Sequence, residues 1–169
     1  TAAFLEDHIS SVTGNMVWAN DNETLFYSKQ DPETLRSFQI YKHKLGKPQE
    51  EDILVYQEDD ETFTCHVSKS KSKEYIFITS NSTVSSESRF IHANEPNGEI
   101  TLIQERVRDL EYAVEHYRDH FLILTNDQEA SNFKLVKTPT VIPGKENWKD
   151  LIPHRKDVLL EGFEVFNDY

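Results

Sequence analysis

The sequence predicts an all-β protein, part of a β-propeller with about three four-stranded antiparallel blades and the start of another. Three observations support this fold class. Short segments rich in β-branched and aromatic residues recur along the chain. They repeat every 45 to 51 residues, which is typical of propeller blades, and loop-forming residues separate them.

Two segments in each repeat set the period. The centres of the first segment are 51 and 46 residues apart, and those of the second are 50 and 45 residues apart. The first series is centred on Phe26, Phe77 and Ile123, and the second on Gln39, Arg89 and Lys134. Because both series keep the same spacing, each pair is predicted to form the two middle strands of one blade.

Two further strands complete each predicted blade. A first strand is expected at 16–20, 63–67 and 111–115, and again at 162–166, where a fourth copy begins. A last strand is expected at 52–56, 99–103 and 148–152. The blades are therefore predicted at about 12–57, 62–106 and 110–153, with an incomplete blade at 160–169, in one partial propeller domain over 1–169.

The connections and the aromatic residues agree with this fold. Asn97–Gly98 is a favoured pair for a tight hairpin, and residues 103–110 are expected to be a strand end and a loop. Trp18, Phe77 and Phe121 are expected to pack between blades. A β-sandwich would not repeat its strands at this period, and a parallel α/β fold would need helical patterns between the strands.

Three and a half blades cannot close a ring, since propellers have at least about four blades. The chain also begins at Thr1 without an initiator methionine, so we expect it to be a piece of a longer protein. Open blade edges carry unpaired backbone groups, which predicts self-association through these edges.

The composition limits the classes of partner. A net charge of −12 argues against nucleic acid, because phosphate binding needs clustered Lys and Arg. The acidity favours solubility, with steering of cationic ligands as the alternative. No apolar run approaches the roughly 20 residues of a membrane-spanning helix, so no membrane partner is expected.

The compartment is expected to be the cytoplasm. Cys65 is the single cysteine, and the N-terminus lacks the pattern of a secretory signal. Asn22 and Asn81 begin matches to the N-glycosylation pattern, which leaves a secreted glycan-binding repeat protein as a third interpretation.

The sequence contains no recognisable catalytic centre. None of its five glycines forms a Gly-x-Ser-x-Gly, Walker or dinucleotide-binding motif. His116 and His120 have the spacing of a helical metal pair, but the segment lacks the Glu of His-Glu-x-x-His and is predicted to be a hairpin turn with two half-exposed histidines. We therefore assign no catalytic residue, metal ligand or cofactor to this chain.

Several longer segments match a known family. They are WANDNETLFY at 18–27, DPETLR at 31–36, QIYKH at 39–43, VSKSKS at 67–72, TND at 125–127 with NF at 132–133, and IPHRKDVLLEGFEVF at 152–166. Through these segments the whole chain resembles the prolyl oligopeptidase family of serine peptidases, and within that family oligopeptidase B.

The resemblance implies a seven-bladed propeller, of which this chain is the middle, and a separate α/β-hydrolase domain with a Ser–Asp–His triad. It also implies that the propeller restricts access to short peptides and that the parent enzyme cleaves after Arg or Lys, so short basic peptides are expected partners. No triad residue and no specificity residue is placed on this chain. The alternative is a free-standing propeller-like scaffold for protein interactions.

Antiparallel strands alternate in direction, which places two kinds of loop on the side that should face the hydrolase domain. These are the loops between second and third strands, at 30–37, 80–88 and 126–131, and those between blades, at 57–62, 105–110 and 154–158. The charged residues in or near them are expected to make interdomain or substrate-gating contacts: Arg36, Glu58, Asp60, Glu87, Arg89, Arg106, Arg108 and Arg155.

Overall fold

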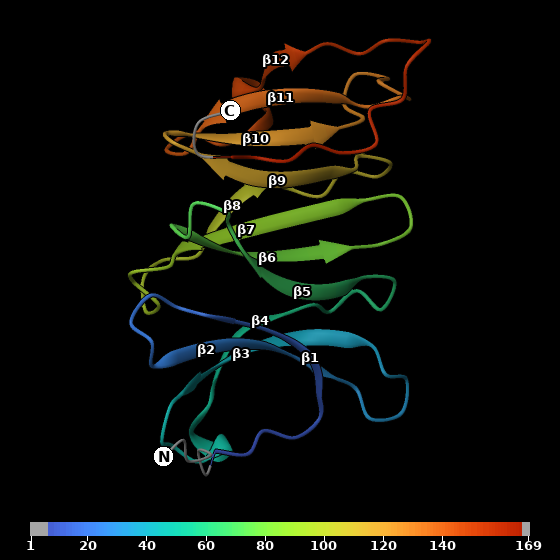
Figure 1. The fold of residues 1–169 in the computed structure, drawn as a ribbon. Coiled ribbons are helices and arrows are strands. Elements are labelled where there is room, and N and C mark those ends of the chain that lie inside the picture. The colour runs from blue at the N-terminus through green and yellow to red at the C-terminus, as the bar shows by residue number, and fades with distance from the viewer. Residues whose placement is uncertain (1–6, 167–169) are drawn as a thin grey trace.

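In the computed structural model, which describes residues 7–166, the chain forms three four-stranded antiparallel sheets that follow one another along the sequence (Figure 1). In each sheet every strand pairs with the next strand in sequence, which is the connectivity of a propeller blade. The predicted all-β fold, a propeller fragment, is confirmed.

The strand bounds agree with the repeat spacing. The first sheet contains β1 (Val12–Trp18), β2 (Thr24–Gln30), β3 (Ser37–Lys44) and β4 (Ile53–Gln57). The second contains β5 (Thr64–Lys69), β6 (Tyr75–Asn81), β7 (Ser86–His92) and β8 (Thr101–Gln104). The third contains β9 (Tyr112–Tyr117), β10 (His120–Thr125), β11 (Lys134–Pro139) and β12 (Lys149–Ile152). Two single 3₁₀ turns, η1 (Gln49–Glu51) and η2 (Lys145–Asn147), precede the last strands of the first and third sheets.

Two local predictions were wrong. The expected fourth first strand at 162–166 is not a strand in the structure, because no neighbouring strand lies beside it in the described part of the chain to pair with its backbone. The connection from β7 to β8 covers residues 93–100 and is not a two-residue hairpin at Asn97–Gly98. Gly98 donates its amide to the carbonyl of Glu95 in a local turn of that connection.

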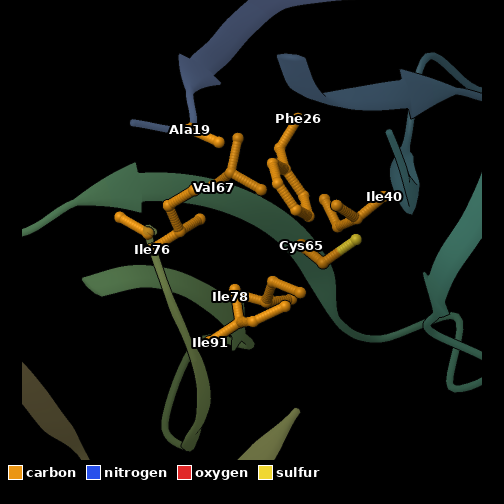
Figure 2. Packing of buried hydrophobic residues seen from close by; sticks show 9 residues of the cluster. Ala19, Phe26, Ile40, Cys65, Val67, Ile76, Ile78 and Ile91 are labelled. Carbon is orange, nitrogen blue, oxygen red and sulfur yellow. The ribbon is translucent and has the colours of Figure 1, made fainter. Parts of the chain in front are cut away.

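Hydrophobic side chains fill the junction between the first and second sheets (Figure 2). Phe26 and Ile40 of the first sheet meet Cys65, Val67 and Ile78 of the second sheet, and all are buried. Burying each large apolar side chain contributes roughly 1.5–3 kcal/mol. The core therefore lies between blades, and each junction depends on residues from both sheets.

Aromatic side chains dominate the junction between the second and third sheets. Phe121 is fully buried and meets Tyr75, Phe77 and Phe90 edge-on, with ring centroids 4.9–5.7 Å apart. The predicted packing of Phe77 and Phe121 is confirmed. Trp18 differs, since it is 41% exposed on β1, where no further sheet covers it among the described residues.

The helical content over residues 7–166 consists of the two short 3₁₀ turns, and neither has the length or apolar character needed to cross a membrane.

Candidate functional site: a charged cluster between the first two sheets

The predicted loops lie together at one end of the sheets. In the first sheet the β2–β3 loop reaches the β4–β5 connection through the side chain of Arg36. In the second sheet Ser85 Oγ accepts the amide of Asp109 at 3.1 Å, which joins the β6–β7 loop to the β8–β9 connection. In the third sheet Asn132 donates to the carbonyls of Arg155 and Lys156. In all three blades, hydrogen bonds thus join the loop between the second and third strands to the connection that follows the fourth strand.

Arg36 binds backbone carbonyls, not carboxylates. Its Nε donates to the carbonyl of Phe63 at 2.7 Å, and its Nη2 donates to the carbonyls of Glu58 and Asp60 at 2.8 and 2.6 Å. A guanidinium group presents its donors in a planar fork, which suits several acceptors along one turn of chain. Arg36 therefore fixes the shape of the β4–β5 connection.

Arg106 joins the two sheets. Its Nη2 and Nη1 donate to the two carboxylate oxygens of Glu58 at 2.6 and 3.3 Å, and its Nη2 also lies 3.3 Å from Glu87 Oε1. Its backbone amide donates to Glu87 Oε2 at 3.0 Å, and Asp60 Oδ2 lies 3.7 Å from Nη1. The guanidinium carbon lies 3.9 Å from the centroid of the Phe63 ring. Arg106 thereby links the loops that leave the first and second sheets.

Arg89 extends the cluster along β7. Its Nη2 pairs with Glu87 Oε1 at 2.7 Å, and its guanidinium carbon lies 4.4 Å from the centroid of the Tyr56 ring. The hydroxyl of Tyr56 donates to Glu58 Oε2 at 2.9 Å and accepts from Ser80 Oγ at 3.2 Å. Tyr56 is thus in contact with both a cation and an anion of the cluster.

We call these six side chains the charge cluster: Arg36, Glu58, Asp60, Glu87, Arg89 and Arg106. Their formal charges balance, and the side chain of Glu58 is only 3% exposed. Burial opposes ionisation of Glu58, but hydrogen bonds from Arg106, the Asp60 amide and the Tyr56 hydroxyl hold its pKa below the usual value. Burial also opposes ionisation of Glu87, whose pKa is nevertheless lowered by the Arg106 amide and by Arg89. Burial opposes the charge of Arg106 as well, yet Glu58 and Glu87 raise its pKa.

The two other predicted residues lie apart from this cluster. The side chain of Arg108 is 92% exposed and lies 3.7 Å from Asp109 Oδ2. Arg155 is also exposed and pairs with Asp157 at 2.7 Å. Exposed ion pairs of this kind contribute little to stability, so both guanidinium groups can exchange these partners for others.

Sequence reasoning missed the aromatic and hydroxyl groups that complete the cluster. Tyr56, Phe63 and Ser80 contact its charges, although the sequence predicted only that the first two belong to strands. The one available signal was the position of Tyr56, two residues before Glu58 at the end of a strand.

The paired histidines form a hairpin, as predicted. His116 and His120 lie near the β9–β10 turn, and His116 is paired in register with Phe121. His120 is half-exposed beside Asp119, but the prediction of half-exposure was wrong for His116, which is buried and bonded through Nδ1 to Ser72 Oγ at 2.8 Å. Within residues 7–166 no group of three His, Cys, Asp or Glu side chains could hold a metal ion.

Three meandering four-stranded sheets, stacked blade on blade, define a propeller fragment. The family model of the prolyl oligopeptidase N-terminal β-propeller domain matches residues 1–169. The chain therefore belongs to this propeller domain of the prolyl oligopeptidase family.

Its relatives include peptidases of several names. Dipeptidyl aminopeptidase BI of Pseudoxanthomonas mexicana is 42% identical over 169 residues, which cover 100% of this chain and 23% of that protein. Protease 2 of Moraxella lacunata is 35% identical over 97% of this chain and 25% of that protein. Oligopeptidase B from Leishmania major has a TM-score of 0.89 at 30% identity, over 95% of this chain and 22% of that one. The chain thus spans about a quarter of the length of these relatives.

Proposed function

We propose that this chain is the non-catalytic propeller portion of a serine oligopeptidase, and that it controls the access of short peptides to a separate α/β-hydrolase active site. The observation that carries this proposal is the match of the whole chain to the propeller domain of a peptidase family. The gathering of the blade-connecting loops on one face supports it, because that face can meet a second domain.

The charged residues of that face divide into two roles under this proposal. The charge cluster holds the loops of the first two sheets in place, because nearly all of its charges are paired within the propeller. Arg108 and Arg155 project from the same face with only exposed neighbours. They are the residues that we expect to form ion pairs with the hydrolase domain and to influence its opening.

A matched pair of charge reversals in the full-length enzyme tests this role. Arg108→Glu and Arg155→Glu should change kcat/KM for a short Arg-containing peptide and alter its dependence on salt, since exposed interdomain ion pairs are screened by ions. The control is Arg118→Glu, because Arg118 is equally cationic but lies at the β9–β10 turn, at the opposite end of the sheet. The proposal fails if the two reversals behave like the control.

The substrate specificity that we propose is cleavage after Arg or Lys. The structural similarity to oligopeptidase B and the matching segments along the chain support it. The similarity to a protein named dipeptidyl aminopeptidase favours a second candidate, removal of dipeptides from a free N-terminus. A full-length enzyme given an Arg-containing peptide with and without an acetylated N-terminus distinguishes the two, since only the first activity cleaves the acetylated peptide.

The alternative to a peptidase part is a free-standing interaction scaffold in the same fold. A Gly-x-Ser-x-Gly segment downstream in the complete gene would support the peptidase and exclude the scaffold. We also propose a cytoplasmic location, which subcellular fractionation of the source cells would test.

A further inference from the structure

His43 lies between two carboxylates, away from the charge cluster. Its ring is 2% exposed, with Nδ1 2.7 Å from Asp52 Oδ1 and Nε2 3.0 Å from Asp7 Oδ1. The two carboxylates come from different parts of the chain. Asp7 belongs to the segment before β1, whereas Asp52 directly precedes β4.

This geometry determines the protonation state of the ring. A carboxylate accepts hydrogen bonds, so a ring nitrogen within 3.0 Å of one must donate. Both ring nitrogens can donate only in the imidazolium form. His43 therefore carries a positive charge while both contacts persist and both carboxylates are ionised.

Among the described residues, no other cation near the ring takes the place of the imidazolium between the two carboxylates. Tyr27 of β2 donates its hydroxyl to Asp52 Oδ2 at 2.8 Å, and Tyr41 of β3 stacks on the Tyr27 ring. Within residues 7–166, no Lys or Arg forms an ion pair with either carboxylate. His8, Lys47 and Glu50 line the open cavity beside Asp7, and Lys47 pairs with Glu51 at 3.3 Å. The imidazolium is therefore the cation that binds the two anions together.

The contact with Asp7 attaches the segment 7–10 to the loop between β3 and β4. Asp7 Oδ1 also accepts the amide of Gly46 at 2.6 Å. Three residues further on, the backbone of Ser10 exchanges hydrogen bonds with the side-chain amide of Gln49 at 3.0 and 3.2 Å. An open cavity of about 630 Å³ is lined by both segments, so their contact is made by polar groups and not by close packing.

The backbone turns sharply where this segment joins β1. Ser11 has a φ of 58°, in the left-handed region that non-glycine residues rarely adopt. Its carbonyl accepts the amide of Gln30, which fixes the chain on the β1 side of the turn. One left-handed residue therefore sets the angle between residues 7–10 and β1.

We propose that His43 is the charged centre of a pH-sensitive latch, which holds Asp7 against the β3–β4 loop at neutral pH and releases it at alkaline pH. When the ring loses a proton, one of its nitrogens presents a lone pair to a carboxylate oxygen, and that contact becomes repulsive. Asp52 is 2% exposed and held by Tyr27, whereas Asp7 is 14% exposed. The Asp7 contact is therefore the one that breaks.

The shifts in the pKa values of His43 and Asp7 agree with release at alkaline pH. Burial opposes the charge of His43, but hydrogen bonds to Asp7 and Asp52 raise its pKa above the usual value. The latch is closed below that raised pKa and opens as the pH rises through it. The His43 hydrogen bond and the Gly46 amide lower the pKa of Asp7, so the carboxylate contact is lost only when the pH falls through that lowered value.

Hydrogen exchange of the full-length protein measures the latch directly. The protection of the Gly46 amide, expressed relative to its intrinsic exchange rate at each pH, should fall by up to about tenfold per pH unit above the pKa of His43. The amide of Thr34 is an internal control, because it donates to the carboxylate of Asp31 at 2.7 Å without a histidine. Its protection should not follow the same curve.

Two substitutions of Asp7 separate the latch from a purely structural role. Asp7→Ala should leave Gly46 unprotected at all pH values. Gly46 and His43 both contact Asp7 Oδ1, so in Asp7→Asn the amide oxygen can still accept from Gly46 but carries no charge to hold the imidazolium. Gly46 protection in Asp7→Asn should therefore be lower than in the wild type at neutral pH and should change less with pH. Neither substitution changes a residue of the buried His43–Asp52 pair.

The inference is overturned by either of two results. One is a wild-type protection curve at Gly46 that runs parallel to that of Thr34. The other is an Asp7→Asn variant that loses protection over the same pH range as the wild type.

Discussion

At the scale of single residues, the charge cluster shows how buried charges are retained in a propeller. Glu58 is almost fully buried but receives hydrogen bonds from Arg106, from Tyr56 and from the Asp60 amide. A buried ion is tolerated when every lone pair has a partner, and it becomes costly when one partner is removed. The cluster therefore contributes to the specificity of the first junction more than to its net stability.

Removal of Arg106 should expose this dependence. Arg106→Ala leaves Glu58 buried without its cation, and we expect a loss of about 3 kcal/mol in the free energy of unfolding, at the low end for a broken buried pair because Arg106 is partly exposed. Urea denaturation measures the change. The matched control Arg108→Ala should stay within about 0.5 kcal/mol, since Arg108 contacts only solvent and an exposed carboxylate. Equal effects of the two variants would contradict the role assigned to Arg106.

The partners within the cluster could not be predicted from the sequence. Alternation of strand direction was enough to place Arg36, Glu58 and Arg106 on one face. The pairing of Glu58 with Arg106 spans 48 residues and depends on how one sheet stacks on the next. A repeat period predicts the number and direction of the strands. It does not predict the rotation of one blade relative to the next, which determines which charged side chains come into contact.

At the scale of elements, the first strands of neighbouring blades are joined by a side chain. The amide group of Asn15 in β1 accepts from the backbone N–H of Val67 at 2.8 Å and donates to its carbonyl at 2.9 Å. This pair of bonds satisfies both backbone groups of Val67, as a neighbouring strand would. β1 also contains a register shift between Val12 and Met16, which turns Asn15 toward the second sheet.

Asn15→Ala should destabilise the chain by about 1–3 kcal/mol, because it leaves both backbone groups of Val67 without a protein partner. Asn15→Asp should cost at least as much, since it places a carboxylate oxygen against the Val67 carbonyl. Thermal or urea unfolding measures both changes. Two variants with wild-type stability would show that water replaces the side chain without cost.

The strands themselves were predictable, whereas several of their ends were not. The spacing of Phe26, Phe77 and Ile123 located the middle strands of all three blades. The segment 162–166 has the composition of a strand but lacks a neighbour, and pairing is a property of two segments that one segment cannot reveal. Asn97–Gly98 failed because a dipeptide does not reveal where the flanking strands end, and here it lies inside the longer β7–β8 connection at 93–100.

At the scale of the whole molecule, one face of the first sheet is not covered by another sheet within residues 7–166. Met16 and Trp18 alternate along β1 and are 55% and 41% exposed. Exposed apolar residues on a sheet indicate an interface. In a complete propeller a further blade would cover this face.

The isolated chain should therefore self-associate at high concentration. Met16→Lys together with Trp18→Lys should shift it toward the monomer, because lysine on an open sheet opposes pairing. Sedimentation velocity over a range of concentrations measures the shift. Val141→Lys is the control, since Val141 is even more exposed but lies in a loop away from β1. Equal shifts from both substitutions would point to a general effect of charge.

The burial of Cys65 makes this residue a natural reporter. Its thiol lies inside the first junction, and burial, followed by the nearby charge of Glu58, raises its pKa to about 12 (Figure 2). The thiolate is the form that attacks electrophilic thiol reagents, so this buried thiol is unreactive while the first two sheets remain in contact. The chain has no second cysteine, so the rate of alkylation of Cys65 measures how often the first two blades separate. No engineered label is needed for this measurement.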